Sequence, residues 1–182
     1  MKNKSILRDY YRYYNCITFK EKLKIFLKAF VLPAYPRDKI CPWIRLGINY
    51  NRNGNSIMRD ICERHIYNKF KCFVSCQSEI GEFVSFPHPV GIVIGFGVKV
   101  GNDCVIYQNV TLGQNKGKYP QIGNNVVIFA GAKIIGNIKI GDNVIVGTNS
   151  VVIHDIPSNC IVAGNPAVIV KLEFDIEDYR AW

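Results

Sequence analysis

From Ile80 to Val152 an apolar residue returns every six positions along the chain. The resulting rows begin at Ile80, Phe86, Ile94, Val100, Ile106, Leu112, Ile122, Ile128, Ile134, Ile140, Val146 and Val152. The fifth position of nearly every row is also small or apolar, as at Val98 and Val126, and Lys116 is the exception. Neither a helical period near 3.6 residues nor the alternation of an ordinary strand gives this spacing. A fixed hexapeptide repeat predicts a mainly β fold, a parallel β-helix in which three rows form one turn of roughly 18 residues.

Glycine often follows the first residue of a row, as at Gly81, Gly101 and Gly123. We expect these glycines at the corners of the coil, where a Cβ atom would be costly. The pairs Asn124-Asn125 and Asp142-Asn143 also suit corners, because Asn and Asp tolerate a left-handed backbone conformation.

Two insertions interrupt the repeat. Two extra residues lie between Phe86 and Ile94, and four lie between Leu112 and Ile122, where the irregular stretch 114–120 reads QNKGKYP. Insertions in a solenoid form loops, often on the face that carries the function. We expect the second loop to project toward the substrate or a neighbouring subunit.

The repeats divide the chain into three parts: a basic helical region at 1–72, the β-helix at 73–166 and a tail at 167–182. Helices are predicted at Lys20–Leu32 and Ser56–Phe70, with Asn55 as the N-cap of the second helix. Pro36 and Pro42 mark an irregular link between the two helices. The second helix is expected to bury its apolar rows at Ile57, Ile61 and Ile66.

The net charge of +9 is concentrated in the N-terminal part. Residues 1–72 hold 16 Lys and Arg against 5 Asp and Glu, whereas residues 73–182 hold 7 against 9. A solvated helical face, an anionic membrane surface or a lipid-linked substrate could account for this charge; nucleic acid is disfavoured because no binding motif is present. No apolar stretch typical of a secretory signal begins the chain, so we expect a cytoplasmic protein.

The candidate chemistry rests on histidine. Seven scattered cysteines without a C-x-x-C motif argue against a disulfide framework and against a zinc site, so no metal is expected. Of three histidines, only His88 is flanked by prolines and lies at an insertion. A neutral imidazole can take the proton of a hydroxyl nucleophile at pH 7. The residues leave His88 open between a catalytic base and a structural histidine at a bulge, and they favour structural or surface roles for His65 and His154.

Several motifs resemble those of the hexapeptide-repeat acyltransferases, in particular the serine O-acetyltransferase-like branch. They are HPVGIVIG (88–95), IYQNVTLG (106–113), AGAKIIG (130–136), IGDNVIVGTNSVV (140–152) and GNPA (164–167). The resemblance implies a left-handed β-helix with an N-terminal helical region, a homotrimer, acetyl-CoA bound in a groove between adjacent coils, and His88 as general base. It further implies that the backbone of Gly113, Ala130 and Gly131 lines the pantetheine arm of the donor. Thr148 is then expected on a later corner of the same groove, and Lys171 near the adenosine phosphates.

Three positions depart from the serine O-acetyltransferase pattern. Pro87 and Phe73 stand where that pattern has aspartates, and Tyr119 stands where it has a histidine. The remainder resembles acetyltransferases of capsule, O-antigen and exopolysaccharide assembly. We therefore predict transfer to a sugar hydroxyl of a cell-surface polysaccharide or its lipid-linked precursor, possible peripheral contact with the inner membrane, and a Tyr119 ring that stacks on the sugar or packs the loop.

Two alternatives remain at this point: serine O-acetyltransferase of cysteine biosynthesis, and a non-catalytic β-helix scaffold. The group that orients the His88 ring is also open, with Glu79, Glu82 or a backbone carbonyl as candidates.

Overall fold

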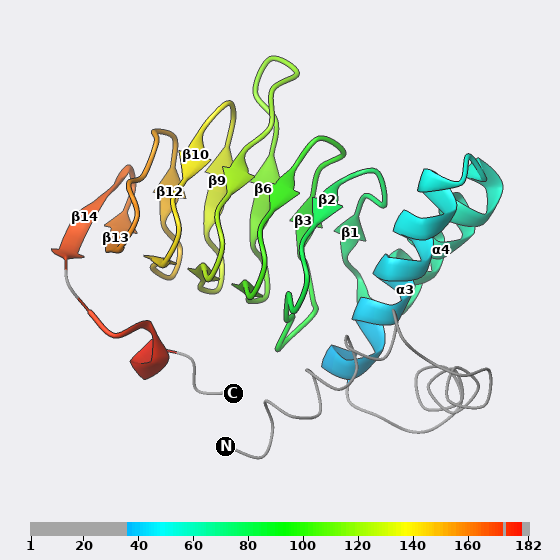
Figure 1. Ribbon diagram of the computed structural model, residues 1–182, viewed down its shortest axis with the longest axis horizontal. Coiled ribbons are helices and arrows are strands. Elements are labelled where there is room, and N and C mark those ends of the chain that lie inside the picture. Colours follow the sequence, from blue (N-terminus) through cyan, green and yellow to red (C-terminus); the bar gives the residue numbers. More distant parts are fainter. Residues whose placement is uncertain (1–35, 173, 180–182) are drawn as a thin grey trace.

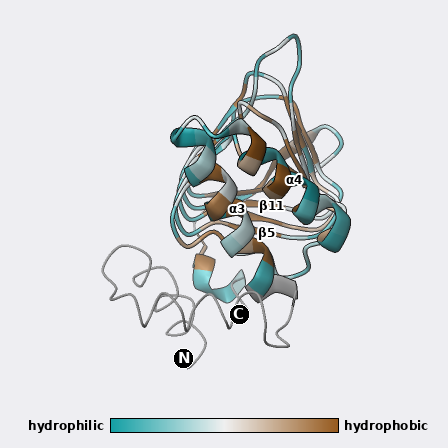
Figure 2. Cartoon of the chain, turned by 90° about the vertical axis from the view of Figure 1, so that its right-hand side faces the viewer, coloured by the Kyte–Doolittle hydropathy of each residue, from teal (hydrophilic) through white to brown (hydrophobic). Residues whose placement is uncertain are grey.

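The computed structural model describes residues 36–172 and 174–179 (Figure 1). The predicted helix at Lys20–Leu32 lies outside the described residues. Two helices, α3 (Pro36–Arg52) and α4 (Ser56–Phe70), precede a coil of short strands, and a 3-10 helix, η1 (Ile176–Tyr179), follows it. The helices pack against each other and cover the first end of the coil (Figure 2).

Helix α4 confirms the predicted bounds and N-cap. The Asn55 side chain accepts a hydrogen bond from the backbone N–H of Met58 at 3.1 Å. The predicted apolar rows are wrong in part, because the Ile57 and Ile61 side chains are 73% and 44% exposed. Packing against α3 and the coil selects a different row, and the buried residues of the helix are Cys62, Ile66 and Phe70.

The predicted irregular link at Pro36 and Pro42 is also wrong, since both prolines belong to α3. Pro36 is the first helical residue, where a missing N–H leaves no helical bond unmade. Pro42 lies inside the helix, where proline is unfavourable because it removes a backbone hydrogen bond. The neighbouring Ile40, Cys41 and Ile44 are buried, so tertiary packing of this segment opposes the local preference.

The coil is the predicted left-handed parallel β-helix, with three sheets. Sheet A contains β1 (Phe73–Val74), β3 (Val93–Ile94), β6 (Thr111–Gly113), β9 (Lys133–Ile135) and β12 (Val151–Val152). Sheet B contains β2 (Glu79–Ile80), β4 (Lys99–Val100), β7 (Gln121–Ile122) and β10 (Lys139–Ile140). Sheet C contains β5 (Val105–Ile106), β8 (Val127–Ile128), β11 (Val144–Val146), β13 (Cys160–Gly164) and β14 (Ala167–Leu172).

The strand register reproduces the repeat. Val93 pairs with Thr111, one turn of 18 residues later, whereas Phe73 pairs with Val93 after 20 residues and Thr111 with Lys133 after 22. The longer turns contain the two insertions. Every row-starting residue from Ile80 to Val152 is buried, at 6% exposure or less. The interior is therefore a set of stacked aliphatic columns, as the spacing predicts.

One corner of the coil carries a ladder of polar side chains. This asparagine edge connects sheet B to sheet C, at residues 81–84, 101–104, 123–126, 141–143 and 157–159. Asn124 Oδ1 accepts the backbone N–H of Asn102 at 2.9 Å, and Asp142 Oδ1 accepts that of Asn124 at 2.6 Å. Asn125 and Asn143 have φ near +55°, the left-handed conformation expected of them. Each turn is thus fastened to the next.

Glycines stack beside this ladder. A Cβ atom on Gly101 would lie 2.5 Å from the carbonyl oxygen of Gly123 in the next turn, and one on Gly81 would lie equally close to the carbonyl of Gly101. The predicted need for glycine at these corners is confirmed, and its cause is the close approach of successive backbones.

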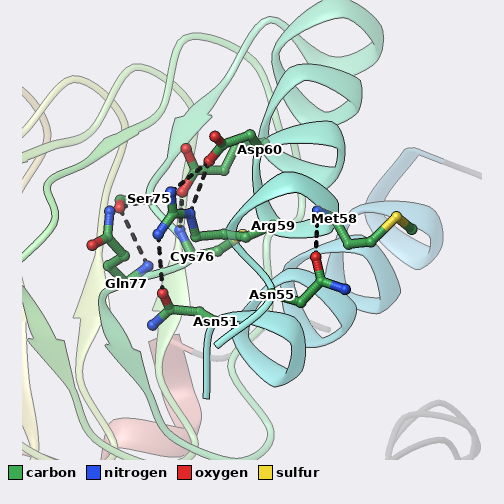
Figure 3. A network of polar contacts seen from close by, with 9 residues as sticks. Asn51, Asn55, Met58, Arg59, Asp60, Ser75, Cys76 and Gln77 are labelled. Atoms are coloured by element: carbon green, nitrogen blue, oxygen red, sulfur yellow. Dashed lines mark hydrogen bonds and ion pairs between the residues drawn. The ribbon is translucent and has the colours of Figure 1, made fainter. Parts of the chain in front are cut away.

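The helices are fastened to the first turn by polar contacts. The Arg45 guanidinium donates to the carbonyl oxygens of Ile80 and Gly81 at the start of the asparagine edge. The Glu63 carboxylate accepts the backbone N–H of Cys76 at 2.7 Å. Figure 3 shows the α4 side of this junction, with Arg59 lying between Asn51 and Asp60. These contacts close the first end of the coil and so cover backbone groups that would otherwise be exposed.

The last turn ends differently. Strand β14 pairs antiparallel with β13 at the edge of sheet C. Beyond it, Phe174, Ile176 and Tyr179 pack on the outer surface of sheet C, near Tyr107 and Ile145. Among the described residues, no helix is both long enough and apolar enough to cross a membrane.

Candidate active site

His88 lies on the corner that connects sheet C to sheet A, which we call the His88 edge: residues 86–92, 107–110, 129–132 and 147–150. The first insertion widens this corner, and the flanking Pro87 and Pro89 are buried while the His88 side chain is exposed. The ring centroid of His88 is 6.3 Å from that of Tyr107, which stacks in turn on Phe129 at 5.2 Å. An imidazole held outside the core in this way is accessible to a substrate.

The same edge carries three other predicted site residues, on two successive later corners of the coil. Ala130 and Gly131 form the corner two turns after His88, and Thr148 lies on the following corner with its side chain exposed. The backbone of Gly131 has φ +78°, and a Cβ atom there would collide with the Asn149 side chain, so only glycine fits. The structure brings His88, Ala130, Gly131 and Thr148 into one line.

Tyr119 lies elsewhere, on the corner between sheets A and B, and Gly113 is the last residue of β6, where this corner begins. This loop edge comprises residues 75–78, 95–98, 113–120 and 136–138, and the second insertion projects from it, as Figure 1 shows after β6. The Tyr119 ring packs against the backbone of two glycines. A Cβ atom added to Gly95 would lie 2.7 Å from the ring, and one added to Gly97 would lie 2.5 Å from it. Phe96 meets the ring edge-on at 5.7 Å. Within one chain, the two insertions therefore open on different edges.

Lys171 lies on β14 opposite Ile161, with its side chain exposed at the border of sheet C.

The residues considered as partners of His88 lie away from its edge. Glu79 is on sheet B, where it forms an ion pair with Lys99 at 2.7 Å, and Glu82 is on the asparagine edge.

The other two histidines have separate surroundings. His65 of α4 stacks on Trp43, with ring centroids 3.7 Å apart, and burial followed by the charge of Lys69 lowers its pKa. His154 is exposed in the last turn of the coil. No cluster of three or more His, Cys, Asp or Glu side chains within residues 36–172 and 174–179 is arranged to hold a metal ion.

The cysteines of the described segments are buried, and Cys16 lies outside those segments. Burial, and after it the charge of the nearby Glu63 carboxylate, raises the pKa of the Cys76 thiol to about 12. Burial also raises the pKa of Cys62, Cys72 and Cys160. A thiolate nucleophile is therefore disfavoured at these four positions.

Sequence reasoning missed one polar residue on the His88 edge. Gln108 follows Tyr107 and lies one turn after His88, and its backbone carbonyl accepts the N–H of Gly131 at 2.9 Å. Its side-chain oxygen is buried without a hydrogen-bond partner in the described part of the chain. The motif IYQNVTLG contained this residue, but the repeat alone gives no signal that separates it from other corner residues.

Comparison with known proteins is consistent with this arrangement. Residues 119–154 match the family described as bacterial transferase hexapeptide (six repeats), so this part of the coil is similar to the repeats of that family. Serine acetyltransferase from Synechococcus elongatus is 45% identical over 97 residues, which cover 51% of this chain and 40% of the relative. The matched stretch thus spans less than half of that curated relative.

Two solved structures are similar in fold. Soybean serine acetyltransferase complexed with serine is 34% identical with a TM-score of 0.70, over 73% of this chain and 56% of that one. A serine acetyltransferase in complex with CoA is 32% identical with a TM-score of 0.70 and the same coverage.

These relatives overturn the predicted sugar acceptor, because the similar proteins are named serine acetyltransferases rather than polysaccharide acetyltransferases. The prediction rested on side chains missing at fixed positions, namely Pro87, Phe73 and Tyr119. Such absences show which groups are not supplied locally. They do not show which groups the folded coil, or a second chain, brings to the same place.

Proposed function

We propose that this protein is an acetyl-CoA-dependent O-acetyltransferase that acts on the hydroxyl of L-serine. The observation that carries the proposal is the exposed imidazole of His88 on the edge of a coil that resembles those of serine acetyltransferases. The CoA complex of one related structure and the serine complex of another support the choice of donor and acceptor.

In the proposed reaction, His88 accepts the proton of the serine hydroxyl as the oxygen attacks the thioester carbonyl. The tetrahedral intermediate then collapses, the carbon–sulfur bond breaks, and the leaving thiolate takes the proton back from the imidazolium. The products are O-acetyl-L-serine and CoA. No thiol nucleophile takes part, in agreement with the raised pKa of the buried cysteines. The reaction needs no metal, because a thioester is activated already.

The donor is proposed to lie along the His88 edge, beside Ala130, Gly131 and Thr148, with Lys171 near the adenosine phosphates. Gly113 and Tyr119 face a different edge of the same chain. A site that contains both edges therefore requires a second copy, which supports the proposed homotrimer. Sedimentation equilibrium of the full chain tests this: a monomer that retains full activity would contradict a site shared between subunits.

The activity is tested by the release of CoA from acetyl-CoA with L-serine, and with L-threonine and L-homoserine as acceptors of different shape. We expect turnover with serine, and a loss of about 10²- to 10⁴-fold in kcat for His88→Ala, since that is the usual contribution of a general base. His154→Ala is the matched control, because this histidine is exposed in the last turn, and it should retain wild-type turnover.

Three results would contradict the proposal in different ways. Unchanged turnover in His88→Ala would show that another group is the base. A wild-type protein that binds CoA and leaves all three amino acids unacetylated would show that the acceptor is wrong. A wild-type protein that does not bind CoA at all would favour a non-catalytic scaffold.

A further inference from the structure

The Gln108 side chain ends in a buried oxygen with no partner. Its Oε1 atom is one of two buried side-chain polar atoms in the described segments that lack a hydrogen bond; the other is Nε2 of His65. A buried carbonyl oxygen without a donor is destabilising in the free protein. The His65 ring at least gains its stacking on Trp43, whereas no ring contact or hydrogen bond is seen for the Gln108 amide within residues 36–172 and 174–179.

The position of Gln108 indicates what could supply the missing donor. His88 lies in the first turn of the coil, immediately after the helices, because the N–H of Gly91 bonds the carbonyl of Lys71 at the end of α4. A long ligand that reaches His88 along this edge must therefore extend toward the later turns. The first corner that it meets in that direction is the one that carries Gln108, before Ala130 and Gly131.

We propose that Gln108 is a donor-binding residue whose Oε1 accepts a hydrogen bond from the pantetheine amide nearest the thioester sulfur. The inference rests on the proposed function in one respect, that the acyl donor is a CoA thioester. It adds a residue and a contact that hold the thioester beside His88.

The spacing supports this assignment. In the pantetheine arm, the sulfur and the nearest amide nitrogen are separated by two carbons, which places them roughly 4 Å apart at ordinary bond lengths. Successive turns of a parallel coil are about 4.8 Å apart. With the sulfur next to His88, the amide N–H therefore reaches the level of the following turn, where Gln108 lies. A neutral acceptor suits this neutral amide, and it positions the arm without adding charge.

The experiment measures CoA binding by isothermal titration calorimetry on the full chain and on Gln108→Met, which keeps the length of the side chain and removes the acceptor. We expect CoA to bind about three- to tenfold more weakly, the usual worth of one neutral hydrogen bond. Adenosine 3′,5′-bisphosphate, which lacks the pantetheine arm, should bind both proteins equally. The melting temperature of Gln108→Met should equal or exceed that of the wild type, because an unpaired buried oxygen is removed.

Two further variants sharpen the result. Gln121→Met changes the same residue type on an exposed position of sheet B and should alter neither binding nor melting. Gln108→Glu keeps an oxygen acceptor at the same place and should retain CoA affinity better than Gln108→Met. It also serves as the informative variant if Gln108→Met does not fold.

The proposal is overturned if Gln108→Met binds CoA as the wild type does, or if it weakens adenosine 3′,5′-bisphosphate equally. It is also overturned if melting falls by several degrees or the subunit assembly changes while CoA affinity stays the same, since Gln108 would then be structural. Failure of the proposed function can be told apart from failure of the Gln108 proposal. A wild-type protein that binds CoA but does not acetylate serine refutes only the acceptor, whereas a wild-type protein that binds no CoA refutes the donor.

Discussion

The asparagine edge and the His88 edge are corners of the same coil, yet they use polar side chains differently. On the asparagine edge, Asn102, Asn124 and Asp142 each accept a backbone N–H from the preceding turn. On the His88 edge, His88 and Thr148 are exposed, and the Gln108 oxygen has no partner in the described chain. The side chains of the first edge hold successive turns together, whereas the second edge is the one on which we propose that the donor binds. A regular repeat can thus separate stability from function by corner.

The largest effect is expected where the backbones of the asparagine edge approach most closely. In Gly101→Ala the new Cβ would lie 2.5 Å from the backbone of Gly123, so two turns must move apart. We expect a loss of about 1–3 kcal/mol in the free energy of unfolding, as for other overpacked sites, measured by chemical denaturation.

Gly113→Ala is the matched control for that change. Its Cβ would meet Cδ1 of Ile135, the end of a flexible side chain, at 2.9 Å. We expect a smaller loss in the free energy of unfolding, because the Ile135 side chain can rotate away from the new Cβ, whereas the backbone of Gly123 cannot. Equal losses in the two variants would show that the close approach of turns is not what requires glycine on the asparagine edge.

A second effect is expected at the start of the same edge. Arg45→Met removes the guanidinium that donates to the carbonyls of Ile80 and Gly81 but keeps an apolar stem. Hydrogen bonds to a charged group contribute about 1.5–3 kcal/mol, less where they are partly exposed. We expect a loss at the lower end of this range and faster amide hydrogen exchange in the first turn than in the last. Uniform exchange changes along the coil would contradict a local cap.

A third effect concerns the ladder itself. Asp142→Ala removes the oxygen that accepts the backbone N–H of Asn124 at 2.6 Å, on an exposed corner. Since water can replace this acceptor, we expect a loss of about 0.5–1.5 kcal/mol in unfolding free energy. Thr148→Ala, on the exposed His88 edge, is the comparison, and a loss there as large as in Asp142→Ala would remove the distinction between the two corners.

The smallest effect is a pH dependence from His65, the other residue with an unpaired buried atom. Burial, and then the charge of Lys69, lowers the pKa of His65 below its ordinary value of 6.5. The unfolded chain therefore binds this proton first as pH falls, so His65 favours folding above pH 6.5 and loses that contribution as pH falls from 6.5 through the folded pKa. Urea midpoints of wild type and His65→Gln should converge at acidic pH. If the difference between the two urea midpoints grows as pH falls, the pKa of His65 in the folded protein is raised and not lowered.

Much of the coil was predictable because its interior has a strict period. The row-starting residues from Ile80 to Val152 are all buried, and the two insertions lie where the spacing broke. Helix α4 was predictable from its Asn55 cap. Helix α3 was not, because Pro42 argued locally for a link, whereas buried neighbours such as Ile40 and Ile44 hold a helix there.

The sequence by itself determined the architecture of this protein, since a hexapeptide period permits one way of burying its aliphatic residues. It also singled out His88, through the insertion and the flanking prolines. Only the tertiary structure decided which residues share an edge. It joined His88 with Ala130, Gly131 and Thr148, moved Gly113 and Tyr119 to another corner, and left the Gln108 oxygen unpaired. The physical reason is that a triangular coil sends every third corner to the same side, and residue spacing alone does not show which polar atoms neighbouring turns will satisfy.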